Sequence, residues 1–354
     1  MLFAVAALWL AAAPGRLPAQ GPWQTSGPAY PQVEAIALVP GDDAVVYAAA
    51  RDPESETSGL FRSEDRGVTW TLLAQAPFQA SVRQAAIDPT GTQRLLAITA
   101  NAVGHEFVYR SEDGGVSWVQ TGLFPADESR TVFFDPVAPD TAYLVGGGHL
   151  ARSEAGGGWE RIADAYTAWV SPEGALFRGE TILAEYPFCP GFFCYTEDAL
   201  LVSTTQGRVF GVVGPGVHLG SNTVAYAPGD SSVVYATSEY EPFVASGDGG
   251  VNWAPVAHGD STGILGSIPQ RHVARIAVDP LDAGTIFLTA VSADPTDGLL
   301  LRSEDGGVHW TRVPVPEPPT GPLAIGRTSR VLFVGTVQGV FRLPLGRTQT
   351  LPPR

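Results

Sequence analysis

Carboxylates are the most numerous groups able to do chemistry, and they gather in the connections between predicted strands. The longest of these connections are residues 51–59, 184–198, 256–272 and 291–298. The acids in the connections are Asp52, Glu54, Glu56, Glu106, Asp127, Glu128, Glu185, Glu197, Asp198, Glu239, Glu241, Asp260, Asp294 and Asp297. Two carboxylates placed across a glycosidic bond can hydrolyse it, and about six to eight oxygen ligands can bind Ca²⁺. Since no connection has the D-x-D-x-D-G spacing, we interpret this charge as solvated and expect no cofactor, with Ca²⁺ as the alternative.

One connection carries an aromatic insertion, residues 186–195, which holds both cysteines of the chain. In an exported protein, Cys189 and Cys194 in a Pro-Gly turn predict a disulfide. The result would be a stiff finger able to bind a partner or a sugar through its aromatic side chains, which are Tyr186, Phe188, Phe192, Phe193 and Tyr195. The alternative is that these rings pack onto the fold. Together with Glu239, Glu241 and Asp294, they form the predicted binding surface.

Other motifs that could carry chemistry are missing from the sequence. The six histidines have no metal-ligand spacing, and no G-x-S-x-G, P-loop or Rossmann phrase lies between a strand and a helix. The formal net charge is -15, and all 21 basic residues are arginines. Because binding to phosphates needs a basic surface, we expect no nucleic-acid partner.

A repeated phrase, S-x-D-x-G-x-x-W, predicts the strands and turns that hold the candidate residues in place. Its four full copies have the marker residues Ser63, Asp65, Gly67, Trp70, Ser111, Asp113, Gly115, Trp118, Ser246, Asp248, Gly250, Trp253, Ser303, Asp305, Gly307 and Trp310. Two altered copies, residues 153–159 and 203–210, have Ala155 and Thr205 in place of the aspartate. Apolar runs on both sides of each copy predict strand, tight turn, strand. The carboxylate can accept backbone N–H groups across the turn, while glycine supplies positive φ.

The phrase resembles the Asp-box, or BNR, repeat of sialidases, sortilin-type receptors, xyloglucanases and photosystem II assembly factors. In those families the repeat lies at a hairpin of a β-propeller, within the WD40/YVTN-like class of repeat folds, and is structural. The resemblance therefore implies a fold more than an activity. Sialidases also resemble one another in an F-R-I-P motif. Here Phe341-Arg342-Leu343-Pro344 is similar but falls near the end of the chain, so we interpret Arg342 as structural.

A second marker predicts the number of blades. Six apolar runs end in a proline turn, and a seventh, residues 323–325, lacks the proline. This spacing predicts an all-β fold: a single seven-bladed β-propeller of four-stranded antiparallel blades. The blades are residues 31–78, 79–123, 124–165, 166–215, 216–256, 257–315, and 316–346 with 22–26. We expect Trp23 to open the outer strand of the last blade, so that N- and C-terminal strands close the ring and remove its open edge.

The two ends of the chain have their own predictions. Residues 1–20 contain an apolar run too short to span a membrane and are interpreted as a signal peptide. Residues 347–354 predict a disordered tail, which leaves the propeller at 21–346. We therefore expect a secreted or periplasmic protein, without a membrane span after cleavage, that is a monomer.

The strand order separates two faces of the predicted propeller. The repeated turns share one face with the turns between first and second strands, and the longer connections share the opposite face. Propellers of the resembling families bind ligands on that second face, which is an analogy of fold. With no recognisable active site, we expect a non-enzymatic scaffold that binds a protein or glycan there. The alternative is a glycoside hydrolase of the sialidase or xyloglucanase kind.

Overall fold

The structure is a computed structural model of the 354-residue chain. It describes residues 23–346, with gaps at 26, 40, 56, 75–80, 92, 102, 125–130, 147, 165–167, 171–175, 179–199, 210, 214–223, 238–242, 257–271, 293 and 295. The predicted signal peptide and tail therefore lie outside the described residues, as does the aromatic insertion with both cysteines. Within the described part, no helix is long and apolar enough to cross a bilayer.

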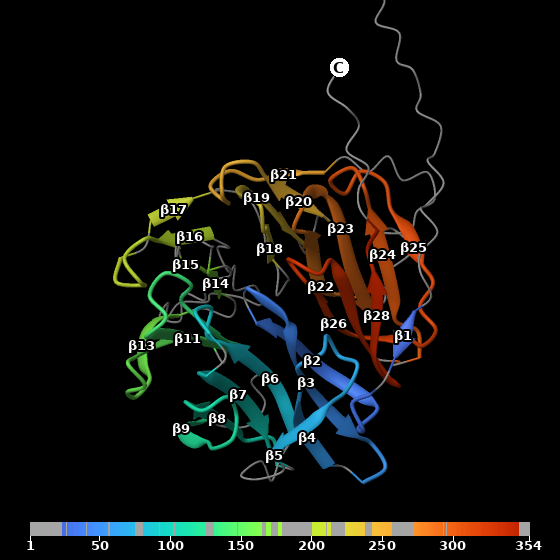
Figure 1. Cartoon of the computed structure of the whole chain (residues 1–354). Helices are drawn as coiled ribbons and strands as arrows, with labels where there is room; N and C mark the ends of the chain where they lie inside the picture. Colours follow the sequence, from blue (N-terminus) through green and yellow to red (C-terminus); the bar gives the residue numbers. More distant parts are fainter. Residues whose placement is uncertain are drawn as a thin grey trace, which may run out of the picture.

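The described strands form seven four-stranded antiparallel sheets. Six are built from four consecutive strands, and the seventh joins the last three strands of the chain to the first. The first three sheets are β2(Gln32–Val39), β3(Asp42–Asp52), β4(Thr57–Ser63) and β5(Thr71–Ala74); β6(Ser81–Ile87), β7(Leu95–Ala100), β8(Glu106–Ser111) and β9(Val119–Phe124); and β10(Thr131–Phe134), β11(Thr141–Gly146), β12(His149–Glu154) and β13(Glu160–Asp164). Figure 1 shows the sheets arranged around a common axis, as in a β-propeller.

The remaining sheets continue around the same axis. They are β14(Ala168–Val170), β15(Leu176–Arg178), β16(Leu200–Ser203) and β17(Gly211–Val213); β18(Val224–Ala227), β19(Asp230–Ala236), β20(Val244–Ser246) and β21(Ala254–Pro255); β22(His272–Asp279), β23(Asp282–Val291), β24(Leu299–Ser303) and β25(Thr311–Val313); and β26(Pro319–Ile325), β27(Val331–Thr336) and β28(Gly339–Pro344) with β1(Gln24–Thr25).

The last sheet joins the two ends of the described chain. Strand β1 pairs with β28 in a register that sets Gln24 opposite Arg342. The indole Nε1 of Trp23 donates to the Pro314 backbone oxygen at 2.8 Å. Trp23 therefore lies beside the outer strand of the last sheet, as its spacing from the first proline turn predicted.

The prediction of seven equivalent blades needs a correction. We call the strand at the axis end of each sheet its inner strand, and the strand at the opposite end its outer strand. Within the described residues, inner strands of neighbouring sheets contact one another from β18 through β22, β26, β2 and β6 to β10. These contacts join six sheets. The sheet β14–β17 lies outside this series, and its strands are three or four residues long. The count failed here because an apolar run that ends in a proline turn, such as residues 169–172, marks the end of a strand without showing whether the strands of that sheet are long enough to pack. The described fold therefore has six packed blades and a short further sheet.

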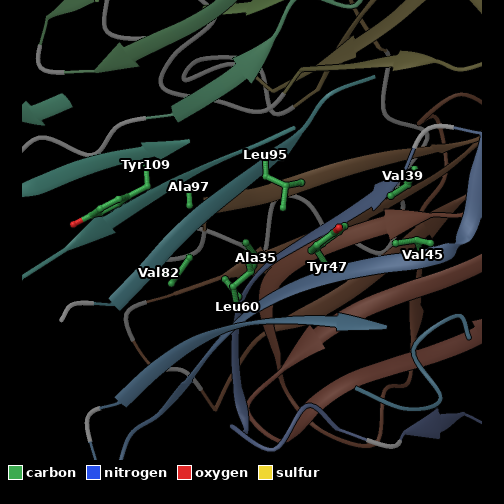
Figure 2. Packing of buried hydrophobic residues seen from close by; sticks show 10 residues of the cluster. Ala35, Val39, Val45, Tyr47, Leu60, Val82, Leu95, Ala97 and Tyr109 are labelled. Carbon is green, nitrogen blue, oxygen red and sulfur yellow. The ribbon is translucent and has the colours of Figure 1, made fainter. Parts of the chain in front are cut away.

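The core lies between the faces of adjacent sheets. One cluster joins the first sheet, through Tyr47 and Leu60, to the second, through Val82 and Leu95, and Figure 2 shows these side chains meeting between the two sheets. All four are at most 1% exposed. Successive side chains of a strand point to opposite faces of its sheet, so β3 contributes Tyr47 to this cluster and Val46 to the cluster on its other face.

Candidate functional site

Hydrogen bonds define which turns share a face. We call the S-x-D-x-G-x-x-W turns box turns. In the first sheet, the Arg66 amide in the box turn donates to the Ala44 oxygen beside the turn between β2 and β3. Equivalent bonds join Gly114 to Gln93 and Gly306 to Gly284. The box turns and the first-to-second-strand turns thus form one face, which we call the box face. The beginnings of the inner strands lie toward the opposite face, the loop face.

The polar groups of the box turns are used inside the turns. In the second sheet, Ser111 Oγ accepts from the Gly115 amide at 2.8 Å, and Asp113 Oδ1 accepts from the Ser117 amide at 2.8 Å. Hydrogen bonds from the side chain and amide of Ser117, with one from Ser111, hold the pKa of Asp113 at about 2. The Trp118 indole donates to the Gly115 oxygen at 3.0 Å. A carboxylate occupied in this way is not free for a ligand.

The altered copies keep part of this pattern. Thr205 stands where the aspartate would be, and its hydroxyl accepts from the Val209 amide at 2.8 Å. In the other copy, Ser153 Oγ donates to the Gly157 oxygen at 2.7 Å. In the first copy a hydroxyl thus replaces the carboxylate as acceptor. In the second, Ala155 replaces the aspartate and the serine hydroxyl bonds across the turn.

Arginines on the third strands act between sheets. Arg342, in the F-R-L-P phrase, donates to the Arg66 oxygen in the box turn of the next sheet around the ring at 3.0 Å. Arg152 donates to the Gln206 oxygen in the same relation, also at 3.0 Å. Arg342 is 9% exposed. These contacts agree with a structural interpretation of Arg342.

Most of the predicted binding surface lies outside the described residues. Tyr186, Phe188, Phe192, Phe193, Tyr195, Glu239 and Glu241 lie outside the described residues, as do Cys189 and Cys194. Asp294 is described and exposed, and its Oδ1 accepts from the amide and hydroxyl of Thr296. Asp52 likewise accepts from the Glu54 amide at 3.0 Å. These two carboxylates therefore stabilise their own turns.

A different carboxylate, Glu34, stands out near the start of inner strand β2. It is the unpaired residue of a bulge between Val33 and Ala35. Its Oε2 atom is buried and has no hydrogen-bond partner among the described residues. Burial raises the pKa of the Glu34 carboxyl, while Arg83 and, less strongly, Arg51 act to lower it. We call these three residues the Glu34 site.

Equivalent bulges bring the charges of the Glu34 site together. Arg83 is the unpaired residue between Val82 and Gln84 on β6, the inner strand of the next sheet. Arg51 is paired with Gln32 at the loop-face end of β3. Bulges re-aim side chains and are frequent beside active sites. Two neighbouring inner strands thus direct opposite charges toward the same end of the axis.

A third bulged inner strand carries another arginine. On β22 the bulge lies between Val273 and Arg275. Arg275 is exposed to water. Inner strands therefore supply several charged side chains at the loop-face end of the fold.

A separate groove lies on the sixth sheet, between the loop after β23 and the link after β25. It has a volume of about 410 Å³ and is lined by Asp297, Arg312 and Glu317 together with three prolines of the link. Gly298 forms one wall, where a Cβ atom would lie 2.0 Å from the Pro319 oxygen. No residue of the Glu34 site lines this groove.

The sequence analysis missed the Glu34 site, although a signal was present. Glu34 and Arg83 each interrupt an apolar run, in Val33-Glu34-Ala35-Ile36 and Val82-Arg83-Gln84-Ala85. A charged residue at the same place in successive inner strands is unusual, because such strands are buried on both faces. The predicted binding surface was instead placed in the longer connections between strands.

Comparison with known proteins gives distant relatives. No family model matches the chain. It is 25% identical over 325 residues to an oligoxyloglucan-reducing end-specific xyloglucanase of Emericella nidulans, which covers 81% of this chain and 35% of that protein. The chain thus spans about a third of the length of the curated relatives it matches.

Solved structures share the propeller fold. A structure described as YCF48 bound to D1 peptide has a TM-score of 0.60 and 13% identity, covering 94% of this chain and 99% of that one. The GH74 xyloglucanase of Xanthomonas campestris has a TM-score of 0.51 and 18% identity, covering 88% of this chain and 65% of that one. At these identities the likeness shows the fold alone.

Proposed function

We propose that this chain is a non-enzymatic binding protein, secreted or periplasmic, whose loop face holds a protein or glycan ligand at the Glu34 site. The observation that carries the proposal is the buried Oε2 atom of Glu34, which lacks a donor among the described residues. A buried acceptor without a donor is destabilising. A ligand N–H or O–H would supply the missing hydrogen bond, and Arg51 and Arg83 would hold an acceptor or anionic group beside it.

A precedent among solved structures supports a binding role. The YCF48 structure, described as bound to a peptide, covers nearly all of both chains. The xyloglucanases are about three times as long as the part that this chain matches. The propeller fold therefore has a precedent in a structure described as bound to a peptide.

A glycoside hydrolase is the second candidate, and one observation favours it. Burial raises the pKa of Glu34, which is the property a general acid needs near neutral pH. Glycoside hydrolysis would also need a second carboxylate across the scissile bond. The charged groups that act on Glu34 are arginines, so the described residues support binding more than hydrolysis.

One experiment separates the two candidates. The full chain and its Glu34→Gln variant are mixed with xyloglucan oligosaccharides, and both heat of binding and release of reducing ends are measured. Binding without release, weakened about tenfold in the variant, supports a glycan-binding protein. Release that is lost in Glu34→Gln supports the hydrolase. If neither occurs, a peptide array probed with the same two proteins tests the protein ligand. Glu54→Gln, at an exposed turn of the first sheet, is the matched control and should behave as the unmodified chain.

A further inference from the structure

Exposed aliphatic side chains are concentrated on the second sheet. Ten large hydrophobic residues of the described chain are exposed, and four of them, Val103, Val116, Val119 and Leu123, belong to this sheet and its turns. Val116 is 75% exposed, Val119 68% and Leu123 59%. Among the described residues no other sheet has more than two. Val119 and Leu123 lie on its outer strand, whereas Val103 and Val116 lie in its turns.

The outer strand of that sheet, β9, also lacks the usual protections of an edge. It has six residues, whereas the other outer strands, β1, β5, β13, β17, β21 and β25, have two to five. Its sequence, VQTGLF, has no charge and no proline. By contrast, β13 contains Glu160 and Arg161, and β25 contains Arg312. Short strands, charges and prolines are what prevent an exposed edge from pairing with another chain.

One protection remains on β9, a bulge at Thr121. The pairing with β8 sets Val108 opposite Gly122 and Tyr109 opposite Gln120, so Thr121 is the extra residue. Its hydroxyl donates to the Val108 oxygen at 3.3 Å and lies 3.4 Å from the donating Trp159 indole. The bulge turns Thr121 inward and leaves Val119 and Leu123 exposed on either side of it.

Charge limits where a second copy of this chain could associate. The chain carries a net charge of -15, so two copies repel each other over most of their surfaces. Strand β9 is an uncharged stretch where that repulsion is weakest. An antiparallel arrangement about Thr121 is self-complementary, because it sets Val119 of one copy opposite Leu123 of the other, twice.

We propose that a second copy of this chain associates through β9, in an antiparallel arrangement centred on Thr121. This departs from the monomer expected from the sequence. One strand edge buries much less than the roughly 1,200 Å² of a stable interface, so the association is weak and depends on concentration. Screening of the negative charge strengthens it, since salt weakens repulsion between exposed groups.

Sedimentation equilibrium of the full chain tests the proposal, in low salt and in ~0.5 M salt at protein concentrations up to several hundred micromolar. Dimer is expected to form and to increase with salt. Val119→Glu should weaken it about tenfold, because each of the two equivalent contacts receives a buried charge. The double variant Val119→Glu with Leu123→Lys should restore association, since the two new charges face each other across the interface. Val119→Glu with Leu123→Glu should not.

Leu72→Glu is the matched control, because Leu72 is an exposed leucine on the outer strand β5 of the neighbouring sheet. It should leave the dimer unchanged. Thermal unfolding of every variant checks that the exposed substitutions leave the fold intact. A chain that stays monomeric at the highest concentration and salt overturns the proposal. So does a dimer that Val119→Glu leaves unaltered, or one that the glutamate–lysine variant fails to restore.

Discussion

The guanidinium of Arg342 donates from Nη1 to the backbone oxygen of Arg66 at 3.0 Å, across the junction of the last and first sheets. The same arginine reaches Gln24 Oε1 at 3.3 Å, on the strand that completes the last sheet. One side chain therefore contacts β1, β28 and the first box turn. Because the bond between Arg152 and Gln206 repeats the relation elsewhere, we infer that third-strand arginines hold neighbouring sheets in register.

Replacing Arg342 by methionine should therefore lower the free energy of unfolding. The variant keeps much of the buried stem but leaves the Arg66 oxygen without its donor, for a loss of about 1–3 kcal/mol. Urea unfolding followed by tryptophan fluorescence measures the change. Arg312→Met, at an exposed position on β25, is the control and should change stability by less than about 0.5 kcal/mol. Equal effects of both substitutions would contradict a bridging role for Arg342.

Trp23, at the junction of the two chain ends, should contribute to the free energy of unfolding. Its indole donates to the Pro314 oxygen, and its ring packs against the buried cluster that includes Val313 and Leu343. Trp23→Ala should cost about 1–3 kcal/mol, and removal of residues 21–30 should destabilise the whole fold. Thermal unfolding by calorimetry checks both changes. An unaltered transition in the truncated chain would show that β1 contributes nothing to closure.

The course of the strands was largely predictable because turn chemistry is local. A serine, an aspartate and glycines at fixed offsets specify the box turn whatever its neighbours are, as the bonds around Ser111 and Asp113 show. The pairing of the strand after Trp23 with the last strand of the chain was predictable from spacing alone. Strand length in the sheet β14–β17 was not, because the altered copy at 203–210 marks a turn without showing how far the strands extend.

The Glu34 site could not be found from turns, because it depends on bulges in strands that are far apart in the sequence. Glu34 and Arg83 are neighbours only through the packing of β2 beside β6. Nothing local in the sequence requires a bulge at either place. The repeated geometry of the box face was thus predictable, while the charged end of the axis needed the three-dimensional fold.

Arg66 occupies a backbone conformation that suits glycine better. Its φ is +60°, and the matching positions in the second and last box turns are Gly114 at +71° and Gly306 at +72°. Arg66→Gly should remove the steric penalty of a side chain there and raise stability by about 0.5–1 kcal/mol. The Arg66 oxygen that Arg342 uses is retained. Urea unfolding measures the gain, and Gly114→Arg, the reverse change in the next sheet, should lower stability by a similar amount.

The box-turn carboxylates should make stability depend on pH in the acid range. The folded pKa of Asp113 is about 2, below its ordinary value of 3.8. A carboxyl whose pKa is lowered by folding contributes stability above its unfolded pKa and loses it as pH falls through the folded one. Asp113→Asn removes the ionisable group, so the variant should be less stable than the unmodified chain at pH 6. The difference should shrink steadily toward pH 2. A constant difference across this range would contradict the assignment.

Glu34 should show the opposite dependence. Burial raises its folded pKa above the ordinary value of 4.5, so the ionised form is disfavoured in the folded chain. Between these two pKa values stability rises as pH falls, and above the folded pKa the destabilisation is fully present. Glu34→Gln should therefore be more stable than the unmodified chain at pH 7, with an advantage that disappears below the unfolded pKa. Urea midpoints from pH 4 to pH 8 measure this, with Glu54→Gln expected to be neutral throughout.

Combined with weaker ligand binding, a stabilised Glu34→Gln would mark a residue kept for binding at the expense of the fold. A destabilised variant would instead show that attraction to Arg83 and Arg51 outweighs burial, making the three residues a structural cluster.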